Sequence, residues 1–395
     1  MKTNMAVFFG CRSVEHEVSV ISAVQAMNAI DRKKYEVIPV YVTKEGEMFT
    51  SPLLFDIESF KGNLDELVKK CEQVTFIRLK NKTVMRSFAS GLFKKCRDTV
   101  IDLAFPIVHG TNCEDGTMAG YFEFLNLPYI SCDIISAAVG MDKAVFKSVL
   151  KSAGLPVLDC MTFRSREFSA DKEHFIREIG KKIGYPLIIK PANLGSSVGI
   201  TKVNSESELE SAISLAASFA EKILAEKAIE NLREINCSVL GDADSCIASV
   251  CEEPFMHDEI LSYADKYEGN SKSKGMASLG RKIPADISEE LSEKIRGLSV
   301  DIMKATGSSG VVRIDYLLDS ESGEVFANEI NTIPGSLAFY LWEASGIKYT
   351  ELIDRLCDIA FKRQRNRDNL TFTIKTNILS GASFGSKGSK GSKFS

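Results

Sequence analysis

Three side chains late in the chain carry oxygen ligands at spacings that suit a metal ion. Asp315 lies in an apolar, β-rich run, and Glu329 and Asn331 lie in a second run, 324–331. The polar, glycine-containing stretch 319–323 between the two runs predicts a β-hairpin. Alternate residues of a strand share a face, so Glu329 and Asn331 point the same way and Asp315 can join them from the partner strand. Two carboxylates and an amide oxygen suit Mg²⁺ shared with a substrate phosphate, although an exposed polar hairpin could carry the same residues.

A lysine and a glycine–serine loop earlier in the chain have the composition of a phosphate-binding site. Lys190 ends an apolar run and leads into Gly195-Ser196-Ser197-Val198-Gly199. Small residues leave backbone N–H groups accessible, serine hydroxyls can donate hydrogen bonds to phosphate, and a lysine can meet its oxygens. The spacing matches neither the Walker loop nor the dinucleotide-binding loop. Taken alone, such a stretch is more often an ordinary turn.

The first third of the chain alternates strand and helix patterns. Strands are expected at 5–9, 37–43 and 100–108, and a helix at 18–30. The order of strand, helix and strand predicts a parallel α/β sheet. Ligands of such sheets lie beyond the carboxyl ends of the strands. Segments 10–17 and 109–116 both follow strand ends, so we expect them to line one cleft.

The remainder of the chain mixes helices, strands and one long polar segment. Strands are expected at 186–190, 200–203, 222–226, 234–240 and 246–252, and helices at 141–152, from Ser205, at 287–305 with Asp286 as its cap, and at 350–362. The segment 257–282 is polar and rich in glycine, serine and lysine. A connection of this length is usually an active-site loop or a disordered stretch.

Composition limits the class of protein. The 395 residues exceed the usual size of one core, so two or three domains are expected. A net charge of −4 gives no reason to expect nucleic acid or an anionic membrane as a partner, and no apolar run approaches the ~20 residues that span a bilayer. The ten cysteines form no Cys-x-x-Cys pair and the four histidines do not cluster with them, which argues against a zinc site and fits a reducing cytoplasm.

The candidate residues belong to an ordered set of motifs. In chain order these are Ser13-Val-Glu15-His-Glu17-Val-Ser19, His109-Gly with Glu114-Asp-Gly-Thr117, Met141-Asp-Lys143, the loop 190–199, Asp265-Lys266-Tyr267, Arg313-Ile-Asp315 and Asn328-Glu-Ile-Asn-Thr-Ile-Pro-Gly335. Through this set, over residues 1 to 365, the chain resembles the D-alanine–D-alanine ligase family of ATP-grasp enzymes, which includes D-alanine–D-lactate and D-alanine–D-serine ligases. Each motif alone is weak, whereas the ordered set is highly specific.

The resemblance implies an ATP-grasp fold of mixed α/β and α+β class with a Rossmann-like parallel α/β domain at the N-terminus. The expected units are a substrate-binding domain at 1–136, a central lid subdomain at 137–222, a C-terminal subdomain with the metal site at 223–365 and a disordered tail at 366–395. It also implies a cytoplasmic enzyme of cell-wall (peptidoglycan) precursor synthesis that forms a homodimer.

The resemblance further implies the ligation of two D-alanines in two steps. The carboxylate of the first attacks the γ-phosphate of ATP, and the amine of the second then displaces phosphate from the acyl phosphate. The reacting anions repel one another, so bound cations must neutralise them. The implied cofactors are ATP and Mg²⁺, with two metal ions for which Mn²⁺ can substitute.

The family's functional residues carry over to matching positions of this chain. The implied metal ligands are Asp315, Glu329 and Asn331, and the implied nucleotide-binding residues are Lys143, Lys190, Ser197, Glu226, Glu234 and Lys266. Glu15 would hold the ammonium of the first D-amino acid in a triad with Ser196 and Tyr267, while Arg313 and the N–H of Gly335 would stabilise the oxyanion. The implied substrate-binding residues are His109, Tyr340 and Leu341.

Three departures from the family pattern concern loops. The chain has Gly10-Cys11 where members usually have two glycines, and the sequence after Tyr267 is unlike the commoner forms. The segment 257–282 is nevertheless expected to close over the reaction and exclude water. After Gly335, Tyr340 takes the position of a serine that, with a following leucine, binds the carboxylate of the acceptor.

The third departure leaves the acceptor open. A D-alanyl ligase that uses D-serine, D-lactate or another D-amino acid is the alternative to a D-alanine–D-alanine ligase. A nucleotide-binding protein without turnover is the alternative from a different class. The complete set of metal ligands, lysines and Arg313 argues against that second alternative.

Overall fold

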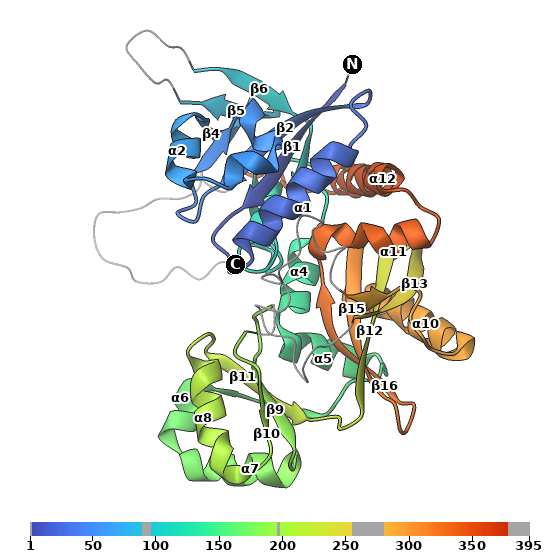
Figure 1. Ribbon diagram of the computed structural model, residues 1–395. Helices are drawn as coiled ribbons and strands as arrows, with labels where there is room; N and C mark the ends of the chain where they lie inside the picture. Colours follow the sequence, from blue (N-terminus) through green and yellow to red (C-terminus); the bar gives the residue numbers. More distant parts are fainter. Residues whose placement is uncertain (1, 89–95, 196–197, 255–279, 378–395) are drawn as a thin grey trace.

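The chain is arranged around three β-sheets that follow one another in the sequence. The computed structural model describes residues 2–88, 96–195, 198–254 and 280–377. The sheets have seven, four and five strands, and in Figure 1 they lie at the top, the bottom and the right of the molecule. Two helices, α4 (Ile134–Met141) and α5 (Lys143–Ser152), lie between them. The predicted mixed fold class is confirmed.

The seven-stranded sheet has a parallel core and an antiparallel extension. Its order is β6-β5-β4-β3-β2-β1-β7, and β1 pairs in parallel with both β2 and β7. The predicted parallel sheet is therefore confirmed, but four antiparallel strands continue it, and the expected strand at 100–108 is two short strands. The bounds are β1 (Thr3–Gly10), β2 (Tyr35–Val42), β3 (Met48–Thr50), β4 (Glu72–Leu79), β5 (Lys82–Ser87), β6 (Asp98–Ile101) and β7 (Leu103–Pro106). The helical segments of this part are α1 (His16–Ala29), η1 (Pro52–Phe55), η2 (Ile57–Phe60), α2 (Leu64–Lys69) and α3 (Thr117–Phe124).

The four-stranded sheet is antiparallel throughout, in the order β10-β9-β11-β8. Its helices pack against it through an apolar core that includes Ile179, Leu187 and Ile213. The strands are β8 (Cys160–Arg164), β9 (Leu187–Pro191), β10 (Thr201–Val203) and β11 (Lys222–Lys227). The helices are α6 (Ser165–Ala170), α7 (Lys172–Lys182) and α8 (Glu206–Ala217).

The five-stranded sheet separates an apolar core from a polar face. Its order is β14-β13-β12-β15-β16, with β12 (Leu232–Gly241), β13 (Cys246–Pro254), β14 (Arg281–Lys282), β15 (Gly310–Asp319) and β16 (Val325–Asn331). Alternate residues such as Ile235, Ile314 and Tyr316 pack against helices that include α5 and α10 (Glu289–Thr306). Since successive side chains of a strand point to opposite faces, the residues between them lie on the other face. The predicted hairpin is confirmed as β15 and β16.

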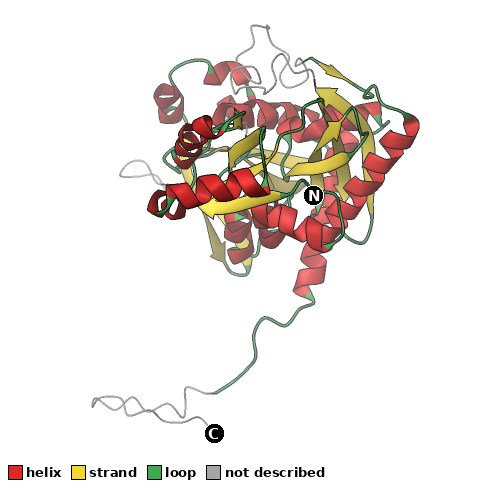
Figure 2. Cartoon of the chain, turned by 90° about the horizontal axis from the view of Figure 1, so that it is seen from below, coloured by secondary structure: helices red, strands yellow, loops and turns green. Residues whose placement is uncertain are grey.

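The last segments return to the first sheet. The 3-10 turn η4 (Gly335–Ala338) is followed by α11 (Phe339–Ala344) and α12 (Tyr349–Asp368). Leu352, Ile353 and Leu356 of α12 are buried in the core of the seven-stranded sheet. Figure 2 shows helices outside the strands and the segment after α12 leading away from the body. No described helix is both long and apolar enough to cross a membrane.

One helix has a different cap from the predicted one. The helix expected at 287–305 with Asp286 as its cap begins instead after Ser288, whose Oγ accepts a hydrogen bond from the N–H of Leu291 at 3.2 Å. Asp286 pairs with Lys282 at 2.7 Å. Serine and aspartate are both good N-caps, so their residue types alone do not show which one caps the helix. The helix begins at Glu289, which makes Ser288 the cap. The tail from 378 onward lies outside the described residues.

Candidate active site

A file of oxygen-bearing side chains crosses the polar face of the five-stranded sheet. Glu252 on β13 lies opposite Asn236 on β12, Asn236 lies opposite Asp315 on β15, and Asp315 lies opposite Glu329 on β16. Register partners in a sheet share a face and lie within reach of one another. The structure therefore brings the predicted ligands Asp315 and Glu329 together and extends the file to two residues that were not predicted.

Arg313 and Asn331 form a second file, two residues along the same strands. Nε and Nη2 of Arg313 donate to the two carboxylate oxygens of Asp315, both at 2.6 Å. The amide of Asn331 donates to Oδ2 of Asp315 at 3.1 Å. Two of the three predicted metal ligands, Asp315 and Asn331, thus lie within one hydrogen-bonded group with Arg313.

The electrostatics of this face favour cations. Burial acts to lower the pKa of Arg313, but Asp315, Tyr340 and Glu252 raise it well above its usual range. Burial raises the pKa of Asp315, and the negative charges of Glu329 and Glu252 raise it further although Arg313 opposes them. Asp315 thus feels two further carboxylates and one guanidinium. A cation that joined the group would relieve the mutual repulsion of these carboxylates.

The donor set fits a magnesium ion that is completed by a substrate. Among the described residues, no three His, Cys, Asp or Glu side chains form a ready metal cage. Two carboxylates and one amide are what a protein normally offers Mg²⁺ when phosphate oxygens and waters supply the rest. At present Arg313 and Lys143 neutralise the two carboxylates.

Three buried lysines converge beside this face. The Nζ atom of Lys143 lies 2.9 Å from Oε2 of Glu329 and donates to the carbonyl of Leu194 at 2.8 Å. Lys190 pairs with Glu226 and donates to Oδ1 of Asn328 at 2.9 Å. Lys147 lies 2.9 Å from the other carboxylate oxygen of Glu226. All three lysines are 3–5% exposed.

Lys147 was not predicted, although a signal for it was visible. It is four residues after Lys143 on the same helix, and residues at that spacing share a face. Lys143 meets Glu329 and Lys147 meets Glu226, so both ammonium groups lie beside the polar face of the five-stranded sheet.

The lysines outnumber the carboxylates that pair with them. Burial acts to raise the pKa of Glu226, but Lys190 and Lys147 outweigh it and lower that pKa to about 2. Burial lowers the pKa of Lys190, and Glu226 only partly opposes this because Lys147 shares the same carboxylate. Three ammonium groups against the carboxylates of Glu226 and Glu329 leave an excess positive charge, which suits a polyphosphate.

Glu15 lies at the junction of the two predicted loops. It is 8% exposed, and a Cβ atom placed on Gly110 or Gly195 would lie 2.7 Å or 3.3 Å from its Oε2. The glycines therefore make room for the carboxylate on two sides. Burial and the charge of Glu15 raise the pKa of the neighbouring Glu114 to about 8, so Glu114 is largely protonated at neutral pH and adds little negative charge beside Glu15.

His109 connects the first sheet to the segment that carries Gly335. Its Nδ1 lies 2.8 Å from the carbonyl of Ile333, so Nδ1–H donates, and its Nε2 accepts from the hydroxyl of Ser22 at 2.8 Å. Burial lowers the pKa of the ring, which fits this neutral tautomer. Both ring nitrogens are used and the side chain is 3% exposed. His109 thus bridges the first sheet and the segment that leads to Gly335, and its predicted contact with substrate stays a prediction.

The residues after Gly335 adopt a left-handed turn. Ser336, Leu337 and Ala338 have φ angles of 50°, 56° and 51°, a conformation that costs a non-glycine residue roughly 1–2 kcal/mol each. The N–H of Ser336 donates to Ser22 at 3.0 Å and its hydroxyl to Gln25 at 2.6 Å. These bonds to α1 hold the turn in place and so fix the direction of the Gly335 N–H.

The two predicted acceptor residues differ in surroundings. The Tyr340 hydroxyl donates to Oε1 of Glu252 at 3.0 Å, at the end of the file described above. Leu341 is fully buried in a small cluster with Ala338 and Tyr340, so its side chain supports α11 and has no free surface in the structure.

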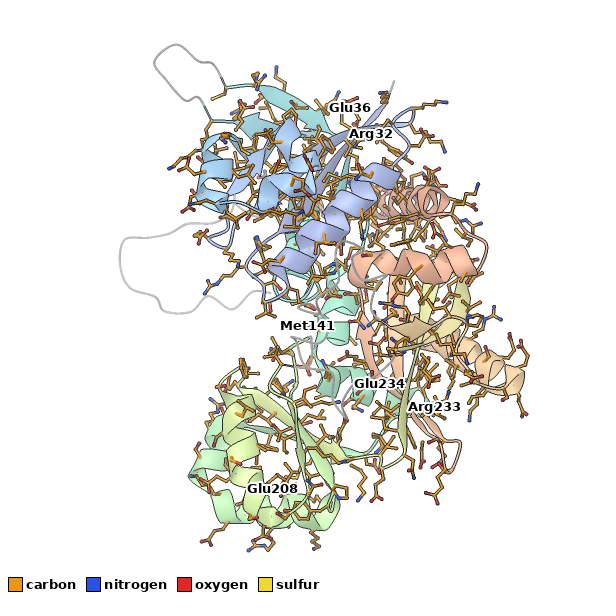
Figure 3. The ribbon with its side chains drawn as sticks, viewed as in Figure 1. Arg32, Glu36, Met141, Glu208, Arg233 and Glu234 are labelled. Carbon is orange, nitrogen blue, oxygen red and sulfur yellow. The ribbon has the colours of Figure 1, made fainter. Side chains whose placement is uncertain are left out.

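Other predicted residues lie at the edge of the site or outside the described ranges. Glu234 is near the start of β12, at the end closer to the four-stranded sheet (Figure 3). Ser196, Ser197, Lys266 and Tyr267 fall in 196–197 and 255–279, which are outside the described residues. Cys11, where the family usually has glycine, has a φ of 74°, so it takes the left-handed conformation that a glycine would favour.

Comparisons with known proteins identify the family. Residues 4–132 match the family described as D-ala D-ala ligase N-terminus, and residues 149–358 match D-ala D-ala ligase C-terminus. The D-alanine–D-alanine ligase of Thermosipho melanesiensis is 40% identical over 377 residues, which cover 95% of this chain and 98% of that relative. The chain belongs to the D-alanine–D-alanine ligase family. The resemblance inferred from the motifs is thereby confirmed, and membership places the chain among the ATP-dependent ligases.

Solved structures of the family share the whole fold. The structure of a D-alanine–D-alanine ligase from Coxiella burnetii matches with a TM-score of 0.77 at 30% identity. The match covers 93% of this chain and 96% of the Coxiella chain. The VanG D-Ala:D-Ser ligase from Enterococcus faecalis has a TM-score of 0.75 at 29% identity, with coverages of 91% and 100%. The predicted ATP-grasp fold is confirmed.

Proposed function

We propose that this chain joins two molecules of D-alanine into D-alanyl-D-alanine, with conversion of ATP to ADP and phosphate, for peptidoglycan precursor synthesis. The observation that carries the proposal is the buried group of Lys143, Lys147 and Lys190 beside the carboxylate file of the five-stranded sheet. That arrangement supplies excess positive charge for a triphosphate next to oxygen ligands for its metal ion. A phosphoryl transfer between anions needs both.

The nucleotide would lie between the four- and five-stranded sheets. Lys143 and Lys190 would bind its phosphates together with Ser197 and Lys266, while Glu226 and Glu234 would contact adenine and ribose. Asp315, Glu329 and Asn331 would hold Mg²⁺, as two ions or with Mn²⁺ in its place. The metal would neutralise the phosphate oxygens when bound.

The first D-alanine would bind at Glu15. The carboxylate of Glu15 would hold its ammonium group, supported by Ser196 and Tyr267. The carboxylate of the substrate would then face the lysine group, attack the γ-phosphorus and release ADP. Lys143 and Lys190 favour this step because they reduce the repulsion between two anions.

The second D-alanine would react beside Arg313 and Gly335. Its amine attacks the carbonyl carbon of the acyl phosphate, phosphate leaves, and the amine loses a proton. Arg313 uses Nε and Nη2 on Asp315, and its Nη1 donates no hydrogen bond within the described residues. That N–H and the N–H of Gly335 would stabilise the negative oxygen that develops.

The test is phosphate release from ATP with single amino acids and with pairs. Release that depends on D-alanine, with D-alanyl-D-alanine found by mass spectrometry, is the expected result. A panel of second substrates (D-serine, D-lactate and other D-amino acids) identifies the preferred acceptor. An absence of release with every D-amino acid would refute the ligase proposal and leave a nucleotide-binding protein.

We also propose that the enzyme acts in the cytoplasm as a homodimer. The ten free cysteines fit a reducing compartment. Light scattering of the purified chain should give twice its mass of 43.5 kDa. A monomer at every concentration tested would remove the dimer from the proposal.

A further inference from the structure

A half-buried arginine lies at the end of the carboxylate file, beyond the predicted ligands. Arg281 on β14 lies opposite Pro254 on β13, two residues from Glu252. It therefore occupies the same face as Glu252, Asn236 and Asp315. The next residue, Lys282, lies on the other face and pairs with an exposed aspartate.

An ion pair and a ring contact hold the Arg281 guanidinium, and further hydrogen bonds hold its partner Glu252. Its Nη1 donates to Oε2 of Glu252 at 2.9 Å, and its central carbon lies 4.2 Å from the centroid of the Tyr340 ring. Tyr340 and Asn236 donate to the other oxygen of Glu252, at 3.0 Å and 3.1 Å. The Arg281 side chain is 10% exposed. A planar cation stacked on an aromatic ring loses little further freedom when a ligand binds it.

This group adjoins the place where the second substrate must react. Asn236 is the register partner of Asp315, to which Arg313 is bonded, and Tyr340 is five residues after Gly335. Oδ1 of Asn236 is buried and has no hydrogen-bond donor among the described residues. A buried acceptor without a donor is unfavourable unless a ligand supplies one, and the amine of an amino acid is such a donor.

An acceptor amino acid also brings a carboxylate that needs a cation. The three buried lysines lie with Glu226 and Glu329 on the nucleotide side, and Arg313 is bonded to Asp315. Arg281, which pairs with Glu252, lies on the opposite side of Arg313, toward β14. A guanidinium has five N–H donors in a fork and can bridge two carboxylates.

We propose that Arg281 determines specificity for the acceptor by binding its carboxylate, with the ring of Tyr340 as the surface on which the guanidinium is held. This inference rests on the proposed ligase function and names a residue for its second substrate. It also gives the Tyr340 position a part that differs from that of a serine: Tyr340 orients the arginine and Glu252, and the arginine contacts the substrate.

The test compares acceptors with and without a carboxylate. Product from ATP, D-alanine and either D-alanine or D-alaninamide as acceptor is quantified by mass spectrometry for wild type, Arg281→Gln, Arg281→Lys and the control Lys282→Gln. Wild type and control should prefer the free acid by about 100-fold. Arg281→Gln should reduce that preference to about threefold or less, because the KM for the acid rises while the Kd for ATP stays unchanged. Arg281→Lys should restore a preference for the acid of about tenfold.

Each outcome decides between the two proposals. An unchanged ratio in an active Arg281→Gln variant would overturn the role of Arg281 and leave the ligase function standing. If that variant does not fold, as judged by circular dichroism, Arg281→Lys decides alone: an acceptor KM equal to that of wild type overturns the inference. If another acceptor from the panel is preferred, that acid and its amide are used. A wild type that gives no product with any acceptor overturns both proposals.

Discussion

Replacement of Glu226 by glutamine should destabilise the protein in a way that depends on pH. Burial acts to raise the pKa of this carboxylate, but the ion pairs with Lys190 and Lys147 outweigh it and lower the pKa from 4.5 to about 2. A difference of 4.5 − 2 = 2.5 units corresponds to roughly 3 kcal/mol of unfolding free energy. This contribution is fully present above pH 4.5 and is lost as pH falls toward 2. Removal of the charge leaves Lys147 and Lys190 buried without their partner, and this lost attraction is the physical origin of the destabilisation.

The assay is urea denaturation of wild type and Glu226→Gln at pH 7 and pH 3, followed by circular dichroism. The difference in unfolding free energy between the two proteins should shrink by roughly 2 kcal/mol between these pH values, because at pH 3 Glu226 is mostly protonated in the unfolded chain but still mostly ionised in the folded wild type. Glu230→Gln is the matched control, since Glu230 is exposed four residues away on the same segment. Urea is preferred to guanidinium because it does not screen the ion pairs.

A constant difference between the proteins at both pH values would refute the reasoning. It would mean that the carboxylate has an ordinary pKa in the folded state, and that Lys147 and Lys190 are not held there by Glu226. The excess positive charge inferred for the nucleotide site would then lack its main support.

Three further predictions concern the chemistry and the junction. Arg313→Ala should reduce dipeptide formation by about 100-fold or more while the Kd for ATP, from calorimetry, stays within about threefold; wild-type turnover would contradict its role. Ser22→Ala removes the partner of both Ser336 and His109, so urea denaturation should show a loss of roughly 2–5 kcal/mol, and no loss would mean that these bonds are dispensable. Chelation with EDTA should abolish phosphate release, and Mg²⁺ or Mn²⁺ should restore it; full activity in EDTA would exclude the metal site.

The hairpin of β15 and β16 could be predicted because its signal is local. Glu329 and Asn331 alternate within one strand, and the turn between the strands is short. The extension of the carboxylate file to Asn236 and Glu252 could not be predicted, because it depends on the register between strands. A bulge lies between Cys237 and Val239 where β12 pairs with β13, and no sequence pattern shows that Glu252 therefore meets Asn236.

Contacts between distant segments account for the remaining gaps. His109 could be placed at a strand end from the sequence. Its hydrogen bond to Ile333 could not be predicted, because the two residues are 224 positions apart in the chain. The three-residue strand β3 is too short to give a periodic signal. Arg281 follows a long polar stretch and contacts Tyr340, which belongs to another motif, so nothing in its own surroundings marked it.

The shared register of the five-stranded sheet also limits how this protein can change over generations. Insertions in the turn 242–245 between β12 and β13 leave both faces of the sheet as they are. The loss of one residue from the middle of β12 would move its apolar residues to the polar face and Asn236 to the core, because the side-chain repeat of a strand is two. A deletion within β12 would therefore disrupt both the fold and the active site. Differences in length between related sequences should accordingly occur in the turns and not within the strands.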